Sequence, residues 1–167
     1  MDIIVGIDPG IHGGVAWING TGAGAMPMPL TSGSESDLDK DVLISFLRWA
    51  DGAAKEGILF VYIEEVHAMP KQGVVSMFTF GYDAGRLRGI ADGLGLPVRT
   101  VHPRAWKTRI LGEYYSHDKA GAIAYCDMFY PQVSLTPERK RVPHDGMADA
   151  LCIATYGWQE THKIEQA

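Results

Sequence analysis

The sequence predicts a single α/β domain in which helices flank a mixed central β-sheet. Short β-branched and apolar runs alternate along the chain with longer segments in which apolar residues recur at helical spacing. The length of 167 residues is typical of one domain, and the 46% of hydrophobic residues is enough for a substantial core. Repeats and low-complexity segments are absent from the sequence, which is the pattern of an ordinary globular fold.

The N-terminal segment predicts a pair of antiparallel strands. Residues 2–8, DIIVGID, are apolar and β-branched and end at a cluster of glycines. A second strand is expected over 13–18, followed by a turn at 19–24 in a hairpin-like arrangement. Residues 26–37 mix Pro, Gly, Ser and acidic residues, a composition typical of a loop.

The middle of the chain predicts helices and strands in alternation. Apolar residues recur at helical spacing over 38–54 and again over 74–94. Between them, 58–66 is a continuous apolar run that ends in two acidic residues, as expected of a central strand buried on both faces. Residues 97–103, PVRTVHP, predict a short strand that ends at a proline.

The C-terminal third predicts two helices. The first is expected over 116–131 and the second over 146–159, and a basic connector rich in turn-forming residues joins them at 137–146. We expect residues 1–158 to form the domain and 159–167 to form a short polar tail.

The sequence carries no sign of secretion or membrane insertion. The longest strongly apolar run, 58–63, is far shorter than the roughly 18 residues of a membrane span, and no secretory signal is visible. Cys126 and Cys152 lie in apolar helical patterns, which favours buried free thiols in a reducing compartment over a disulfide. We therefore expect a cytoplasmic protein.

Charge is distributed unevenly along the chain. The net charge is −5, but residues 71–141 hold eleven Lys and Arg against six Asp and Glu. The remainder holds four Lys and Arg against fourteen Asp and Glu. A basic middle segment is suited to a polyanion, and acids at both ends of the chain are suited to metal. The alternative is an uneven but solvated surface.

Acidic residues stand where they are least expected. Asp8 ends the first strand, and Glu64 and Glu65 end the strand in the middle of the chain. If these strands are neighbours, their C-terminal ends bring Asp8 and one glutamate together, at the edge where open α/β sheets bind ligands. Asp145 and Asp149 open the last helix and share one of its faces, because they are four residues apart.

Grouped carboxylates repel one another and are costly to desolvate, and a divalent cation removes both costs. Hard oxygen ligands without a matching set of His or Cys favour Mg²⁺ or Mn²⁺ over Zn²⁺. Two such ions about 4 Å apart activate a water and stabilise the leaving oxygen of a phosphodiester. The sequence therefore predicts a site for two such ions.

Each acid also has a structural interpretation. Asp8 precedes Pro-Gly and could serve only to form a turn, and Asp145 could serve only as a helix N-cap. Glu64 and Glu65 could belong to a solvated strand end, and alternation along a strand lets at most one of them face Asp8. Asp149 lies close to the buried side of its helix, where an unpaired acid is costly.

Three motifs and three further fragments, in this order along the chain, resemble the RuvC-type Holliday junction resolvases. The motifs are GIDPG on the first strand, YIEEV on the middle strand and HDGMADALCIA on the last helix. The fragments FGYDAGRLRGI, VHPRAWKTRIL and DKAGAIAYCDMFYP are similar to the phage and chloroplast branch of that family. The resemblance runs from residue 2 to about 158 and implies a ribonuclease H-like fold.

The resemblance also implies an activity and a set of site residues. The activity is the resolution of four-way DNA junctions by paired symmetric nicks, with phosphodiester hydrolysis by two metal ions. Asp8 would bridge both ions, and Lys119 would lie near the scissile phosphate. The resemblance favours Glu64 over Glu65. The remaining pair of ligands would be Asp145 and Asp149, with His144 as a rival or partner of Asp145.

DNA contacts are expected in the basic middle segment and in the apolar stretch that follows the middle strand. By resemblance, that stretch would line the junction centre and the dimer interface, with Phe78 or Phe80 stacking on an unpaired base. A four-way junction has approximate two-fold symmetry, which an isologous homodimer matches. The candidate phosphate contacts are Lys71, Arg86, Arg104, Lys107, Arg109, Arg139, Lys140 and Arg141.

Other functions remain open on the sequence. A ribonuclease H-like nuclease could act on flaps or other branched DNA. The first strand also resembles the first phosphate loop of the actin and sugar-kinase ATPases, but those need two such domains. An inert DNA-binding module would leave four acids to repel DNA. The resolvase interpretation places the protein in the cytoplasm of a bacterial or phage-infected cell.

Overall fold

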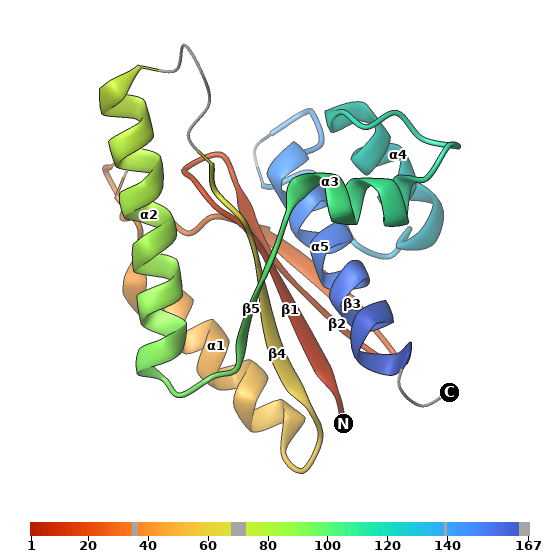
Figure 1. The fold of residues 1–167 in the computed structure, drawn as a ribbon, viewed down its shortest axis with the longest axis horizontal. Helices are drawn as coiled ribbons and strands as arrows, with labels where there is room; N and C mark the ends of the chain where they lie inside the picture. Colours follow the sequence, from red (N-terminus) through yellow and green to blue (C-terminus); the bar gives the residue numbers. More distant parts are fainter. Residues whose placement is uncertain (35–36, 68–72, 139, 164–167) are drawn as a thin grey trace.

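The computed structural model describes residues 1–34, 37–67, 73–138 and 140–163. These residues form a five-stranded mixed sheet with helices on both faces (Figure 1). The strands lie in the order β3-β2-β1-β4-β5. Their bounds are Ile3–Asp8 for β1, Gly14–Asn19 for β2, Ala23–Pro27 for β3, Leu59–Glu64 for β4 and Val98–Val101 for β5. The predicted α/β class is confirmed.

The predicted antiparallel hairpin is confirmed, and the condition that the two acid-bearing strands are neighbours is met. β1 pairs antiparallel with β2 and parallel with β4, and β4 pairs parallel with β5. β1 therefore occupies the middle of the sheet, and β4 is an interior strand beside it. In the parallel pair Ile7 lies opposite Ile63, so the C-terminal ends of β1 and β4 meet at one edge.

The strand β3 corrects the prediction of a turn at 19–24 and a loop from 26. Residues 23–27 have the composition AGAMP, which carries little β propensity, and they pair with β2 as an edge strand. The partner of Gly24 is Trp17, and a Cβ on Gly24 would lie 2.6 Å from the Trp17 indole nitrogen. β3 is therefore defined by its pairing with β2 and by the Trp17 side chain that lies across it. A local sequence pattern does not reveal either contact.

Helices cover the two faces unequally. α1 (Lys40–Ala54) and α2 (Val74–Gly93) lie on one face, and α3 (Pro103–Trp106), α4 (Lys119–Phe129) and α5 (Asp145–Thr161) lie on the other (Figure 1). A single π-helical turn, Lys107–Leu111, continues α3. The helices of α1, α2, α4 and α5 were predicted, and the segment 103–111 was not. No helix among the described residues is long and apolar enough to span a membrane.

Two hydrophobic cores lie on opposite faces of the sheet because strand side chains alternate. On β1, Ile3, Val5 and Ile7 pack toward α1 and α2, whereas Ile4 packs toward α5. On β4, Val61 and Ile63 belong to the first core and Tyr62 to the second. The alternation places the even-numbered positions at the ends of both strands on the α5 face.

Close backbone contact sets the position of α5 against β1 and β2. A Cβ on Gly6 would lie 2.2 Å from the carbonyl oxygen of Ala150, and a Cβ on Gly146 would lie 2.2 Å from that of His12. Only glycine allows this approach at both positions. The contact brings the N-terminal end of α5 to the same edge as the C-terminal ends of β1 and β4.

Cys126 of α4 and Cys152 of α5 are both buried and free, as predicted, with their sulfur atoms 3.9 Å apart. At the C-terminal end, α5 continues to Thr161, so residues 159–161, which were expected to belong to a tail, are helical.

Candidate active site

Two of the predicted acids, Asp8 and Glu64, lie side by side at the carboxyl edge of the sheet. Both are even-numbered strand residues, so both point to the α5 face, and their strands are direct neighbours. Glu65 lies beyond the end of β4 on the other side of the alternation, is exposed, and pairs with His67 at 3.4 Å. The geometry therefore places Glu64, and not Glu65, beside Asp8.

The first turn of α5 brings the other two acids to this edge. His144 is the N-cap of α5 and accepts a hydrogen bond from the backbone N–H of Met147 through Nδ1, at 3.3 Å. Asp145 is the first residue of the helix, so its side chain is not needed as the cap. Asp149 follows one turn later on the same face.

Two of the four carboxyl groups, Asp8 and Asp149, have pKa values raised by burial and by the charges of neighbouring acids. Burial, and then the charges of Glu64, Asp149 and Asp145, raise the pKa of Asp8 well above its usual value. Burial, helped by Glu64 and Asp145, raises the pKa of Asp149 to about 7. Burial also raises the pKa of Glu64. Buried carboxyl groups that lie close to one another resist ionisation in this way.

Two lysines offset part of this negative charge. Lys119, at the start of α4, forms an ion pair with Asp145. Burial opposes ionisation of Asp145, but the hydrogen bond and charge of Lys119 outweigh it and lower the pKa of Asp145. Lys107 lowers the pKa values of Asp8, Glu64 and Asp149 by its charge. Lys107 was predicted to contact phosphate, and the structure places it at the acids.

Asp8, Asp145 and Asp149 line a cleft of about 300 Å³. Its walls include the loop from Pro9 to Gly13 and the side chains of Phe80 and Lys119. Gly10 has a φ of 100°, and a Cβ there would lie 3.2 Å from the Phe80 ring. Glycine at this position thus permits both the turn and the approach of Phe80. The glycines after β1 make room beside the acids.

The four acids suit a hard divalent cation, provided that the cation displaces Lys119 from Asp145. Four carboxylates supply the oxygen ligands that Mg²⁺ and Mn²⁺ prefer. Within the part of the chain that the structure describes, no three His, Cys, Asp or Glu side chains are arranged as they stand to hold one metal ion. Lys119 pairs with Asp145, and the indole Nε1 of Trp106 donates a hydrogen bond to Glu64 at 2.5 Å. A cation would have to take the place of Lys119 at Asp145.

The structure separates the predicted DNA-contacting residues into groups. Phe80 lies at the cleft, and Phe78 is 74% exposed on α2. Arg104, Lys140 and Arg141 are exposed. Arg86 pairs with Asp37 at 3.0 Å and also lies near Asp83. Lys71 and Arg139 lie outside the described residues.

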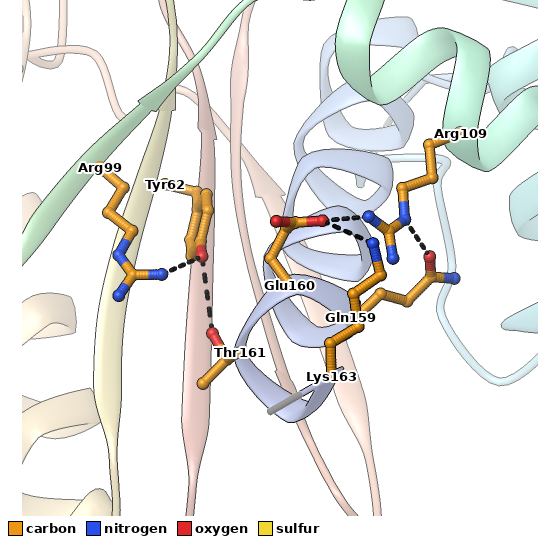
Figure 2. Close-up of polar contacts among 7 residues, drawn as sticks. All are labelled: Tyr62, Arg99, Arg109, Gln159, Glu160, Thr161 and Lys163. Atoms are coloured by element: carbon orange, nitrogen blue, oxygen red, sulfur yellow. Dashed lines mark hydrogen bonds and ion pairs between the residues drawn. The ribbon is translucent and has the colours of Figure 1, made fainter. Parts of the chain in front are cut away.

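Arg109 lies in a different environment from the acids. It forms an ion pair with Glu160 and donates a hydrogen bond to Gln159 at 2.8 Å (Figure 2). Glu160 is at the far end of α5, about 22 Å from Asp145 along the helix at 1.5 Å per residue. The structure therefore does not bring Arg109 to the site, and gives it a role in holding α5.

Trp106 is a site residue that the sequence did not single out. It lies within the fragment VHPRAWKTRIL, but an apolar residue next to a lysine has the pattern of an ordinary core position. Its partner Glu64 is 42 residues away along the chain. A local pattern does not reveal a hydrogen bond of that span.

Comparison with known proteins identifies the fold. The chain superposes on Thermus thermophilus RuvC in complex with a Holliday junction substrate with a TM-score of 0.57, at 16% identity, over 98% of this chain and 97% of that one. A second Thermus thermophilus RuvC structure gives a TM-score of 0.53 at 18% identity, over 95% of each chain. This chain has the RuvC fold. The fold expected from the sequence resemblance is thereby confirmed.

A sequence relative points in the same direction as the RuvC fold. The chain is 30% identical over 105 residues to the chloroplastic Holliday junction resolvase MOC1 of Chlamydomonas reinhardtii. The match covers 63% of this chain and 12% of that relative's length. No protein-family model matches the chain. The predicted resemblance to junction resolvases, including its chloroplast branch, is confirmed by these similarities.

One prediction is overturned by the same finding. The sequence was interpreted as that of a cytoplasmic protein of a bacterial or phage-infected cell. The matched relative is chloroplastic, which contradicts that location. The absence of a visible sorting signal in this chain was a weak basis for assigning a compartment.

Proposed function

We propose that this chain is a structure-selective endonuclease that resolves four-way DNA junctions by metal-dependent hydrolysis of phosphodiester bonds. The observation that carries the proposal is the convergence of four carboxylates, from β1, β4 and α5, at one edge of the sheet. An excess of buried negative charge next to an open cleft suits divalent cations and, through them, a phosphate. The RuvC fold and the similarity to the MOC1 resolvase support the choice of substrate.

In this proposal Asp8, Glu64, Asp145 and Asp149 would hold the cations, and Asp8 would be the central ligand. The chemistry that two Mg²⁺ or Mn²⁺ ions supply is the activation of a water and the stabilisation of the leaving oxygen. Asp8 is suited to the central position because each of the other three carboxylates contributes to its raised pKa.

Lys119 acts as the protein's own counter-charge before substrate arrives. Its side chain is 77% exposed while its ammonium group pairs with Asp145. A long, solvated side chain of this kind exchanges partners at little cost. With Asp145 holding a cation, Lys119 would be free of this pair and able to contact the scissile phosphate. Lys107 remains beside the acids and offsets their residual charge.

The substrate surface extends from the cleft over α2 and the basic loop before α5. Phe80 lies at the cleft and is placed to stack on an unpaired base. Arg104, Lys140 and Arg141 supply salt-dependent phosphate contacts. Val74, Val75, Phe78 and Tyr82 are exposed on α2, so this stretch is not core. We assign that apolar face to a homodimer contact, which presents two sites to a two-fold symmetric junction.

The experiment that tests this function compares three substrates. The purified protein is incubated with Mg²⁺ and an end-labelled four-way junction, a flap or a plain duplex of matched sequence. Paired nicks at symmetric positions of the junction alone are expected, and the Asp8→Asn variant is the inactive control. Equal cleavage of the flap would replace the resolvase with a broader branched-DNA nuclease. The absence of cleavage of any substrate would overturn the proposal.

A further inference from the structure

Trp106 joins the hydrophobic core to the acidic cluster. Its side chain is fully buried, with no exposed surface, in the core between the sheet and α4 and α5. Its indole Nε1 donates a hydrogen bond of 2.5 Å to Oε2 of Glu64. The same side chain therefore packs against apolar groups and contacts an acid of the proposed site.

The chemistry of the indole makes this contact directional. The ring nitrogen can only donate a hydrogen bond, and a buried indole that lacks an acceptor loses the hydration of its N–H. Fully packed rings have little rotational freedom, so the position of the N–H is set by the core. A charged acceptor makes the bond shorter and stronger than one between neutral groups. The core thus dictates where one oxygen of Glu64 lies.

We propose that Trp106 is a positioning residue for Glu64, holding Oε2 through its indole N–H so that the other carboxylate oxygen is oriented for a divalent cation. This inference rests on the metal-dependent function proposed above. The contact is of the kind in which a residue behind a metal ligand fixes the orientation of that ligand. Glu64 ends its strand and has a side chain with three rotatable bonds, so without such a partner its carboxylate would sample several orientations.

The segment that carries Trp106 also carries a cation for the cluster. Lys107 follows directly, and its Nζ lies 5.3 Å from the centre of the Trp106 ring. α3 starts at Pro103 and its N-cap His102 accepts the backbone N–H of Arg104, so a short, well-defined helix turn delivers both residues. One local element therefore sets the orientation of Glu64 and offsets part of its charge.

The first test reads the hydrogen bond itself, without DNA or catalysis. The chain has four tryptophans, so a ¹H–¹⁵N spectrum should contain four indole signals, and the one lost in Trp106→Phe belongs to Trp106. In Glu64→Gln, which leaves the packing of the indole untouched, that signal should move upfield because the acceptor is no longer charged. Addition of Mg²⁺ should shift it in the wild type. If the chemical shift of the Trp106 indole N–H is the same in Glu64→Gln as in the wild type, the inference is wrong.

The second test measures the consequence for the site. Trp106→Phe keeps a buried aromatic ring and removes the N–H. We expect its affinity for Mn²⁺, measured by calorimetry without DNA, to fall about 10- to 100-fold, the range found for residues that orient metal ligands. The rate of cleavage at low Mg²⁺ should fall by a similar factor and recover in part at high Mg²⁺, while junction binding is unchanged. Trp49→Phe, at a half-exposed tryptophan on α1, is the matched control and should change neither.

The outcomes separate this inference from the proposed function. If Trp106→Phe binds Mn²⁺ and cleaves like the wild type, Trp106 is only a core residue and the inference is wrong, although the nuclease proposal stands. If the wild type cleaves no DNA but the indole signal still responds to Glu64→Gln and to Mg²⁺, the positioning role stands and the proposed activity does not. If Trp106→Phe has a lowered melting temperature, its metal affinity and cleavage rate are set aside. The inference is then tested only by whether the Trp106 indole signal shifts in Glu64→Gln.

Discussion

The two ends of α5 differ in how their charges are balanced: those at the C-terminal end are paired with opposite charges, whereas acids cluster at the N-terminal end. At the C-terminal end, Glu160 pairs with Arg109 and Lys163, and His162 pairs with Asp2 at 3.0 Å. Figure 2 shows Arg109, Gln159, Glu160 and Lys163 drawn together there, with the Arg99–Tyr62–Thr161 contacts beside them. At the N-terminal end, Asp145 and Asp149 face Asp8 and Glu64, against the charges of Lys107 and Lys119. One helix thus has a compensated end and an acidic end.

This difference separates stability from function. At the C-terminal end, where opposite charges are paired, the contacts hold α5 against the rest of the fold, and the charges are already neutralised. Where like charges are gathered and the pKa values of Asp8 and Asp149 rise, the fold loses stability that a bound cation would restore. The acidic end is therefore the place that we propose for the chemistry, with the compensated end as its support.

The largest effect is expected from removing the central carboxylate of the acidic end. Asp8→Asn should lower junction cleavage by about 10³-fold or more, because in the proposed function this acid serves both cations. Binding of the junction in Ca²⁺ or without metal should stay within a few-fold, since the DNA contacts lie elsewhere. A gel-shift assay and a cleavage assay on the same preparation check this. Wild-type cleavage by Asp8→Asn would remove the two-metal assignment.

The next contrast is between neighbouring glutamates. Glu64→Gln should reduce cleavage by about 10²-fold or more, whereas Glu65→Gln should leave it within about two-fold, because only Glu64 points to the α5 face. Single-turnover cleavage rates measure both variants. Loss of activity only in Glu65→Gln would mean that the alternation at the end of β4 is wrong.

Stability at the acidic end should depend on pH and metal. The folded-state pKa of Asp149 is about 7, above its usual value of 3.8, so its contribution to stability is complete below about pH 4 and is lost as the pH rises through 7. Asp149→Asn should therefore raise the melting temperature of the metal-free protein by about 5 °C at pH 8, for a gain on the order of 2 kcal/mol after solvent screening. At pH 4 the difference should be small.

Thermal unfolding with and without Mn²⁺ at both pH values checks this prediction. Mn²⁺ should stabilise the wild type more at pH 8 than at pH 4, because protonated carboxyls bind cations poorly. If Asp149→Asn melted at or below the wild-type temperature at pH 8, the ionised Asp149 would not be destabilising the metal-free protein, and the prediction would be wrong.

The smallest effect is expected at the compensated end. Arg109→Met removes a charge that is matched by Glu160 and keeps most of the aliphatic length of the side chain. The loss of stability should be about 1 kcal/mol or less, and cleavage and junction affinity should stay within about two-fold. Lys140→Met on the basic loop is the matched variant, and it should weaken junction binding. If Arg109→Met weakened junction binding by more than about two-fold, Arg109 would have to be counted among the DNA-contacting residues.

Much of the fold could be predicted because local patterns and burial agree. The run LFVYIE is apolar on both faces, and the heptad-like spacing of Leu43, Leu47 and Ala50 matches one face of a helix, so β4 and α1 were found. The strand β3 was missed because its residues carry no β signal and are held by their partner β2. The segment that carries Trp106 was missed because it joins a single α-helical turn to a π-helical turn, which is too short and irregular for a helical apolar period to show.

By itself, the sequence determined the α/β class, the strand and helix that carry each acid, and the resemblance that gave the acids a role. It placed Asp8, Glu64, Asp145 and Asp149 at element ends, because local periodicity and composition reach that far. The resemblance already favoured Glu64 over Glu65, and the tertiary structure supplied the physical reason, because only Glu64 points to the α5 face with Asp8. Only the tertiary structure decided which arginine is matched by Glu160 and that Trp106 contacts Glu64. These depend on contacts between residues more than 40 positions apart, which no local pattern encodes.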